Sequence, residues 1–259
     1  MRRPGPPTKR NKSPLVNFQQ TLDYLYGLQL FGIKLGLENI RALLERLGHP
    51  QNSFSCLHVA GTNGKGSVCA LLAEILRQSG MRNGLYTSPH LHCFTERIRV
   101  DGQPISRELA CALAEEVRTA SASLPITFFE ATTAMALLAF QRSGVDVAVL
   151  ETGLGGRLDA TNVVQPVLSL ITPVSLDHQE YLGDDLAAIA MEKAGIIKPG
   201  VPVVIGKQEP AARAVLLEFA DGRSAPVYLA DRDYQWSESP AGPVLCLADK
   251  PVAWFTHDT

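Results

Sequence analysis

"HVAGTNGKGSV", residues 58–68, is a glycine-rich run with a single lysine, set between a short apolar segment and an apolar-periodic stretch. Its glycines permit backbone conformations that other residues rarely adopt, and Lys65 supplies a cation. A helix that starts directly after such a turn presents free backbone amides and the positive end of its dipole to a phosphate. A tight turn with an exposed lysine is the simpler alternative. The position between a buried strand and an amphipathic helix favours nucleotide binding.

The run departs from the standard Walker A pattern, G-x-x-x-x-G-K-[ST], at two positions. Val59 occupies the place of the first glycine, and Gly66 occupies the place of the hydroxyl residue that ligates magnesium. Gly61, Gly64 and Lys65 remain, and they are enough to hold phosphate. Because the hydroxyl is missing, a magnesium ion needs another protein ligand.

Composition limits the class of protein. The chain has 259 residues, 46% of them hydrophobic, which is enough to bury a sizeable core. A formal charge of −2 argues against a nucleic-acid partner held by bulk electrostatics. The five cysteines contain no C-x-x-C pair, and no uncharged apolar run is long enough to span a bilayer. We therefore expect a cytoplasmic protein with reduced thiols and no membrane partner.

Short apolar strands alternate with helical segments, which predicts an α/β fold with a mostly parallel sheet flanked by helices. The expected helices span 17–28, 37–47, 66–79, 106–122, 130–142, 184–194 and 210–220. The expected strands span 56–60, 83–88, 145–150, 167–172, 202–206 and 226–230, with a strand and a turn in 97–106. Residues 234–256 predict a hairpin. Residues 1–14, basic and with four prolines, predict a disordered leader to a domain spanning 15–259.

Three side chains follow predicted strands at the edge where open α/β sheets bind ligands, and they are candidates for the magnesium site. Ser88 follows one strand, Glu151 directly ends an apolar run, and His178 follows a third strand. A carboxylate that emerges from a buried strand is costly unless it is paired or bound to metal. Taken singly, Ser88 is a turn residue, Glu151 is a partner for Arg157, and His178 is a hydrogen-bonded loop residue. Their joint position beside a phosphate loop favours the metal site.

Seven stretches match, in chain order from about residue 17 to about residue 206, the motifs of one ligase family. They are "GTNGKGS", "LYTSPHL", "FTERIRVDG", "FFEATTAMAL", "VLETGLGGRLDATNVV", "SLDHQEYLG" and "EKAGIIKPG". On these stretches the chain closely resembles folylpolyglutamate synthase and dihydrofolate synthase, within the larger Mur ligase group. Peptidoglycan Mur ligases typically have GKTT in the loop, so GKGS with TSPHL indicates the folate branch.

The resemblance implies the P-loop NTPase-like central domain of a Mur ligase, acting as an ATP-dependent ligase with Mg²⁺. The γ-phosphate passes to a carboxylate of dihydropteroate or a reduced folate, and the amine of L-glutamate attacks the resulting acyl phosphate. Lys65 and magnesium neutralise the moving charge. The implied ATP-binding residues are Gly61, Thr62, Asn63, Gly64, Lys65, Gly66 and Ser67. The implied magnesium residues are Ser88, Glu151 and His178, of which His178 is also expected to be catalytic.

Lys193, in "MEKAGIIK", is a further catalytic and metal-site candidate that depends on the resemblance. Taken alone, it is a surface lysine in the last turn of a helix, where the helix dipole favours a cation. In the resembling enzymes, carbon dioxide converts this lysine to a carbamate, which would anchor a second magnesium ion. Carbamylation requires a neutral amine, so the site would have to lower the pKa of the lysine.

The pterin-binding residues are also taken from the resemblance. They are Lys34, Leu35, Gly36, Thr127, Phe128, Phe129, Glu130, Leu158, Asp159 and Ala160. Phe128 and Phe129 are equally compatible with a role in the core at a helix start. Glu130 suits a hydrogen bond to a pterin ring, but it also suits the first turn of a helix.

The resembling enzymes carry a second α/β domain after the ATP domain, and residues 1–259 do not contain it. We therefore expect this stretch alone to lack ligase turnover and, in line with the family, to be a monomer. Two alternatives remain: a nucleotide-binding module without catalysis, and a P-loop kinase or GTPase. Gly66 argues against the second, because those enzymes have a hydroxyl directly after the lysine. The sequence does not distinguish dihydrofolate synthase, folylpolyglutamate synthase and a bifunctional enzyme.

Overall fold

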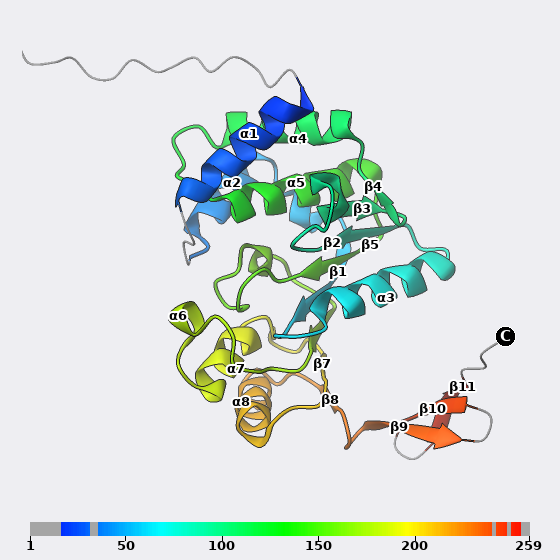
Figure 1. The fold of residues 1–259 in the computed structure, drawn as a ribbon. Coiled ribbons are helices and arrows are strands. Elements are labelled where there is room, and N and C mark those ends of the chain that lie inside the picture. Colours follow the sequence, from blue (N-terminus) through cyan, green and yellow to red (C-terminus); the bar gives the residue numbers. More distant parts are fainter. Residues whose placement is uncertain (1–16, 32–35, 240–241, 248–249, 255–259) are drawn as a thin grey trace, which may run out of the picture.

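The computed structural model describes residues 17–31, 36–239, 242–247 and 250–254 (Figure 1). The predicted leader, 1–14, and two of the pterin candidates, Lys34 and Leu35, lie outside the described residues. The statements below apply to the described part of the chain.

The main sheet has eight strands, in the order β4-β3-β2-β5-β1-β6-β7-β8. Their bounds are β1 Ser55–Ala60, β2 Asn83–Tyr86, β3 Ile98–Val100, β4 Gln103–Pro104, β5 Val147–Glu151, β6 Leu168–Ile171, β7 Val203–Ile205 and β8 Val227–Leu229. The pairs from β2 through β8 are parallel, and only β2–β3 and β3–β4 are antiparallel. The chain crosses β5 on leaving β1 for β2, and it crosses β1 on leaving β5 for β6. The carboxyl ends of β1, β5 and β6 therefore meet where the strand order reverses, which is the usual ligand position in such sheets.

Eight α-helices accompany the sheet within the described residues. They are α1 Phe18–Gly27, α2 Glu38–Arg46, α3 Lys65–Gln78, α4 Arg107–Ala120, α5 Phe128–Ser143, α6 Gln179–Leu182, α7 Leu186–Ala194 and α8 Pro210–Asp221. Short 3₁₀ turns are η1 Leu28–Phe31, η2 Pro50–Asn52, η3 Phe94–Arg97 and η4 Ala160–Val163. Several ends follow the predicted signals: the Ser106 hydroxyl accepts from the Leu109 amide, and Gly144 closes α5 in the left-handed conformation.

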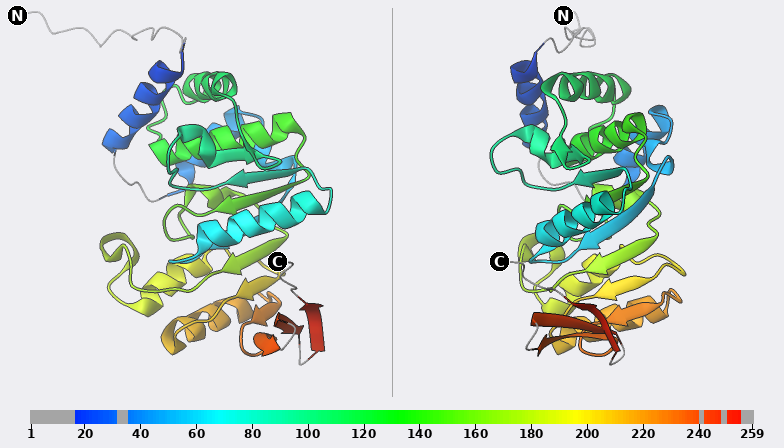
Figure 2. Two further views of the ribbon diagram at one scale, coloured as in Figure 1. Left: turned by 45° about the vertical axis from the view of Figure 1, so that its right-hand side comes forward. Right: turned by 90° about the vertical axis from the view of Figure 1, so that its right-hand side faces the viewer.

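Helices cover both faces of the sheet (Figures 1 and 2). Along β5, Val149 packs under α3 in one core cluster, whereas Ala148 and Leu150 belong to the larger cluster that contains α5. This alternation is the period of two expected of a strand between two layers of helices. A third cluster packs α7 and α8 against β6, β7 and β8. The predicted α/β class with a mostly parallel, helix-flanked sheet is confirmed.

The end of the chain differs from the prediction. Instead of one hairpin, β9 Tyr234–Ser239, β10 Gly242–Leu247 and β11 Lys250–Trp254 form a separate three-stranded antiparallel sheet beyond β8 (Figure 1). β10 pairs antiparallel with both β9 and β11. The predicted hairpin therefore corresponds to two successive hairpins, with a register shift between Leu245 and Cys246.

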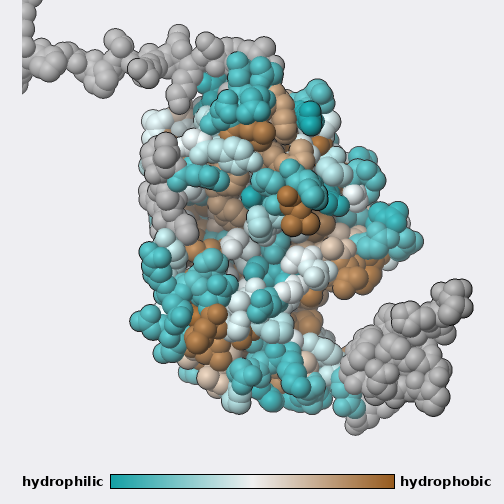
Figure 3. Space-filling model, viewed as in Figure 1, coloured by the Kyte–Doolittle hydropathy of each residue, from teal (hydrophilic) through white to brown (hydrophobic). Residues whose placement is uncertain are grey.

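The outer side of α3 exposes two large apolar side chains beside the charged Glu74 and Arg77. Leu71 is 65% exposed and Ile75 is 61% exposed, one turn apart, and α3 accordingly carries a brown surface in Figure 3. No helix among the described residues has the length and apolar character needed to cross a bilayer.

Candidate functional site

The phosphate loop leaves β1 after Ala60 and enters α3 at Lys65. Gly61 has a φ of +148° and Gly64 a φ of +81°, both in the region that favours glycine. The hydrogen bond that opens α3 runs from the Val68 amide to the Gly64 carbonyl, at 3.0 Å. The amides of residues 65–67 therefore lack partners within the helix, and they are placed to bind an anion.

The loop is tied to the segment that follows β6. The backbone amides of Thr62 and Asn63 both donate to the Pro173 carbonyl, at 3.0 and 3.4 Å. The Thr62 hydroxyl donates to the Ser175 carbonyl, and the Asn63 amide group donates to the Ser175 hydroxyl, each at 3.1 Å. These contacts bring the predicted phosphate-binding residues Thr62 and Asn63 against the loop that carries His178.

Lys193 is buried, and its expected alternative as a surface lysine is wrong. It is 3% exposed, because it shares the buried side of α7 with Ile189 and Ala190. Its Nζ donates to the Gly61 carbonyl at 2.8 Å, and the Lys65 Nζ donates to the same oxygen at 3.1 Å. Burial, and secondly the charge of Lys65, lowers the pKa of Lys193 to about 8. The lowered pKa that carbamylation requires is therefore present.

Glu151 is the last residue of β5 and is 4% exposed. Its Oε2 accepts from the Ser88 amide at 3.0 Å. A Cβ built on Gly66 would lie 3.7 Å from both Glu151 oxygens, so the carboxylate occupies the side on which a Walker A hydroxyl would lie. Burial raises the pKa of the Glu151 carboxyl. The expected alternative partner, Arg157, pairs instead with Glu192 at 2.7 Å.

The structure brings Ser88 and Glu151 together, but no hydrogen bond or ion pair among the described residues joins either of them to His178. His178 has a φ of +48°, its side chain is 55% exposed, and its Nε2 lies 3.6 Å from an Asp177 oxygen. No group of three or more His, Cys, Asp or Glu side chains suited to a metal ion occurs in the described part of the chain. A magnesium ion does not need one, since it commonly takes one or two carboxylates together with water and substrate phosphates.

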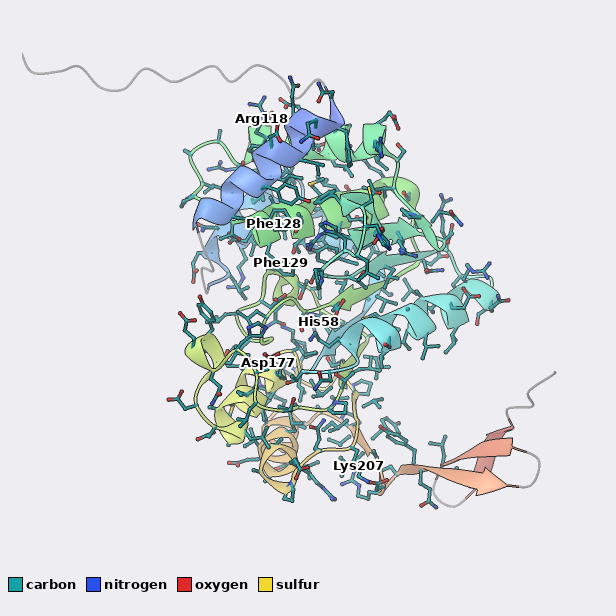
Figure 4. All side chains as sticks on the ribbon, viewed as in Figure 1. His58, Arg118, Phe128, Phe129, Asp177 and Lys207 are labelled. Atoms are coloured by element: carbon teal, nitrogen blue, oxygen red, sulfur yellow. The ribbon has the colours of Figure 1, made fainter. Side chains whose placement is uncertain are left out.

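A cavity of about 510 Å³ opens beside Ser88, and all eight of the described pterin candidates line it. The candidates in its wall are Gly36, Thr127, Phe128, Phe129, Glu130, Leu158, Asp159 and Ala160. Gly153 and Leu154, which follow Thr152 beyond the end of β5, also line the cavity. In Figure 4, Phe128 and Phe129 lie together at the start of α5 on one side of the site, and Asp177 lies on the other side.

The start of α5 serves both the core and the cavity. Thr127 and Glu130 form a capping box, in which the Thr127 amide donates to the Glu130 carboxylate at 2.7 Å. The alternative role of Glu130 as a first-turn helix acid is therefore confirmed. Phe128 stacks on Tyr26 with ring centroids 5.7 Å apart, and a Cβ on Gly153 would lie 2.5 Å from the tip of the Phe129 ring. Only glycine at 153 leaves room for that ring.

Asp159 is almost fully enclosed. Its Oδ2 accepts from the amides of Gly153 and Leu154, and its Oδ1 accepts from the amide and hydroxyl of Thr161. Burial raises the pKa of Asp159, whereas these four donors act in the opposite direction. All the lone pairs of the carboxylate are in use, so in this structure Asp159 shapes the cavity turn.

Arg97 is a cavity residue that the sequence analysis missed. It is 7% exposed, and it is the only cation among the described residues that line the cavity. Its Nε donates to His90 Nδ1 at 2.7 Å, and its Cζ lies 5.1 Å from the centre of the Phe128 ring. No carboxylate lies within salt-bridge distance of it in the described part of the chain. An enclosed cation without a carboxylate is placed to receive an anionic ligand.

A strand, a glycine-rich loop and the N-terminus of a helix thus lie next to a buried glutamate and a large cavity. The family model of the Mur ligase middle domain matches residues 59–225, more than half of the chain. The chain belongs to the Mur ligase family.

Comparisons with individual proteins place this Mur ligase domain among folate enzymes. It is 42% identical to the dihydrofolate synthase/folylpolyglutamate synthase of Bacillus subtilis, over 81% of this chain and 50% of the relative. Its fold matches Escherichia coli FolC in complex with DHPP and ADP, with a TM-score of 0.87 and 34% identity over 95% of this chain and 59% of that one. An FPGS–AMPPCP–folate complex matches with a TM-score of 0.83 and 37% identity, over 93% and 62%.

These likenesses confirm the resemblance drawn from the seven sequence stretches. The chain spans about half the length of most of the curated relatives that it matches.

Proposed function

We propose that this Mur ligase domain binds ATP and the pterin substrate in a ligase that joins L-glutamate to dihydropteroate, to a reduced folate, or to both. The γ-phosphate of ATP passes to the substrate carboxylate, and the glutamate amine then displaces phosphate from the acyl phosphate. The products are an amide, ADP and phosphate. Relatives of this name, and neighbours solved with ADP, DHPP or folate, support the proposal.

The observation that carries the proposal is the position of Glu151 between the phosphate loop and the cavity. On one side its carboxylate faces Gly66, at the start of α3. On the other side it accepts from Ser88, which lines the cavity. An ATP phosphate bound by the loop and a substrate carboxylate bound in the cavity would therefore both lie next to the Glu151 side chain.

The protein also supplies a partner for the substrate carboxylate. Arg97 lies in the cavity wall, and its backbone carbonyl accepts from the amide of Thr87, the residue before Ser88. Its Nε is already used by His90, which leaves the two Nη groups for a carboxylate. The aromatic rings of Phe128 and Phe129 suit the flat pterin ring system.

Mg²⁺ fits the site at Glu151. The Glu151 carboxylate and the Ser88 hydroxyl are hard oxygen ligands, and ATP phosphates and water would complete the shell. Bound there, the ion neutralises charge that accumulates on the transferred phosphoryl group. As the resemblance implies, we also assign His178 to this magnesium site, and a second ion to a carbamate on Lys193.

The test is an ADP-release assay on the full-length protein with ATP, L-glutamate and either dihydropteroate or a reduced folate, because residues 1–259 alone are expected to lack turnover. We expect ADP to appear only when both co-substrates are present. Comparing the two pterin substrates decides between dihydrofolate synthase, folylpolyglutamate synthase and a bifunctional enzyme. ADP release that ignores both co-substrates would contradict the ligase and indicate a different P-loop enzyme.

Lys193 should form a carbamate at neutral pH. With a pKa of about 8, about a quarter of Lys193 side chains are neutral at pH 7.5, compared with about one in a thousand for a lysine of ordinary pKa. Addition of ¹³C-bicarbonate should therefore give a carbamate resonance in the carbon NMR spectrum. At constant dissolved carbon dioxide, its intensity should rise between pH 6.5 and 8.5.

Lys198 provides a matched control for this measurement. Its pKa is also lowered, mainly by burial, but its Nζ donates to Asn162 Oδ1 at 2.7 Å. The resonance should disappear in Lys193→Arg and persist in Lys198→Arg. Persistence of the resonance in Lys193→Arg would exclude Lys193 as its source.

A further inference from the structure

His58 lies in β1, three residues before Gly61, and is 0% exposed. Figure 4 shows it at the centre of the sheet, behind the site. Its Nε2 lies 2.8 Å from the Thr161 hydroxyl. Burial lowers the pKa of His58 to about 3, so the ring is neutral at physiological pH. The other ring nitrogen, Nδ1, has no hydrogen-bond partner in the described part of the chain.

The direction of the hydrogen bonds follows from the number of protons available. Thr161 has one hydroxyl proton, and it donates this proton to Asp159 Oδ1. The hydroxyl must therefore accept from His58, which places the ring proton on Nε2. His58 donates to Thr161, and Thr161 donates to Asp159.

The chain ends at the cavity. Asp159 Oδ2 accepts from the amides of Gly153 and Leu154, at 2.8 and 2.9 Å. Both residues line the cavity, two and three residues after Glu151. The His58 side chain is thus connected to the Gly153–Leu154 turn of the cavity wall through the Thr161 hydroxyl and the Asp159 carboxylate.

His58 is a poor choice if only stability matters. An enclosed nitrogen without a partner costs free energy, and an aliphatic side chain of similar size would remove that cost. In the neighbouring strands, Leu150 and Ser169 lie opposite His58. The Ser169 hydroxyl donates to the Ile196 carbonyl at 3.0 Å. The partly unsatisfied histidine is better explained by what its Nε2–H does.

We propose that His58 is a positioning residue of the cavity: through Thr161 and Asp159 it holds the Gly153–Leu154 turn in the shape that receives the acceptor substrate. That the substrate is a pterin carboxylate rests on the proposed function. The positioning of the turn does not depend on the identity of the ligand.

The test compares variants that keep or remove each donor. His58→Leu and Thr161→Val remove a donor, whereas His58→Gln and Thr161→Ser keep one. In the first pair we expect amide hydrogen exchange at Gly153 and Leu154 to accelerate about 10- to 100-fold, and pteroate binding to weaken by a similar factor. ADP affinity should stay within about twofold. His58→Gln and Thr161→Ser should recover most of the amide protection and most of the pteroate affinity. The double variant His58→Leu/Thr161→Val should have the same exchange rates and pteroate affinity as Thr161→Val alone.

Ser169→Ala is the matched control, because Ser169 is equally buried on the same sheet face but lies outside the chain of donors. It should leave both amides and pteroate binding unchanged. Nitrogen NMR of the free protein should show the His58 proton on Nε2. A proton on Nδ1, or unchanged exchange at Gly153 and Leu154 in the donor-free variants, would overturn the proposal.

Two further outcomes are separable. If the wild-type protein binds no pteroate, the proposed substrate fails, and the exchange rates at the turn still decide the role of His58. If His58→Leu does not fold, the Thr161→Val and Thr161→Ser pair tests the link to Asp159, and the position of the ring proton in the wild-type protein together with His58→Gln tests the link to His58. A joint loss of ADP and pteroate affinity would assign His58 a general structural role and overturn the proposal.

Discussion

Alanine at position 61 is expected to distort the phosphate loop and to abolish ATP binding. A Cβ on Gly61 would overlap the Thr172 hydroxyl and would lie 2.9 Å from Thr172 Cβ and 3.0 Å from its carbonyl oxygen. The φ of +148° is unfavourable for alanine regardless of the space available. Overpacking and backbone strain together cost about 2–4 kcal/mol. In a chain of this size that lowers Tm by about 5–15 °C.

The functional loss should exceed the loss of stability, because Gly61 O is the acceptor for both Lys65 and Lys193. A shift of this carbonyl moves both cations away from the phosphates. Displacements of about 1 Å at such sites cost about 100-fold in rate. Calorimetric titration with ATP and ADP release would measure the effect.

Gly66→Ala is the control for Gly61→Ala. A Cβ at Gly66 meets nothing closer than the Glu151 oxygens at 3.7 Å, and Gly66 lies inside α3, where alanine is preferred to glycine by about 1 kcal/mol. Its Tm should be unchanged or higher. A Gly61→Ala protein with the Tm and ATP affinity of the wild type would contradict the steric argument.

Local rules in the sequence were sufficient for most of the fold. The alternation of strands and helices, the cap at Ser106 and the left-handed stop at Gly144 depend only on neighbouring residues, and the structure has all of them. The phosphate loop was predictable for the same reason, since strand, glycines, lysine and helix are contiguous. A single hairpin accounts for only two of the three strands of the small sheet, because the segment after Tyr234 is divided at two places, after Ser239 and after Leu247.

Burial of charged side chains was harder to predict, because it depends on distant packing. Charged and apolar residues alternate from Arg97 to Val100, which predicts that the arginines lie on a solvated face of a strand. The structure places Arg97 before β3, where its side chain lies over the Phe128 ring. Lys193 did carry a signal. It lies four residues after Ile189, on the apolar side of α7, and that spacing predicts burial.

Glu151→Gln should stabilise the free protein while it removes the dependence of ATP binding on magnesium. Burial raises the pKa of Glu151 above its unfolded value, so the folded state is favoured by protonation and loses stability as pH rises through the folded pKa. At pH 7.5 the charged carboxylate therefore costs free energy. The amide keeps an oxygen for the Ser88 N–H and carries no charge, so in EDTA we expect Tm to rise by about 2–6 °C. This gain should shrink as pH falls through the raised folded pKa of Glu151, because the wild-type carboxyl is then neutral as well.

Nucleotide binding should change in opposite directions with and without the metal. With Mg²⁺, ATP affinity should fall by about 100-fold, because the ion loses its buried carboxylate ligand. In EDTA the variant should bind ATP more tightly than the wild type, because a negative charge facing the phosphates has been removed.

Glu130→Gln is the matched control: Glu130 is also 4% exposed, but its carboxylate accepts from the Thr127 amide in the capping box. Glutamine at 130 keeps an oxygen for the Thr127 amide and loses only the favourable negative charge at the start of α5, so Tm should be unchanged or slightly lower, and magnesium dependence should be kept. Equal magnesium dependence in Glu151→Gln and the wild type would exclude Glu151 as a ligand, and a lower Tm in EDTA would contradict the cost assigned to its buried charge.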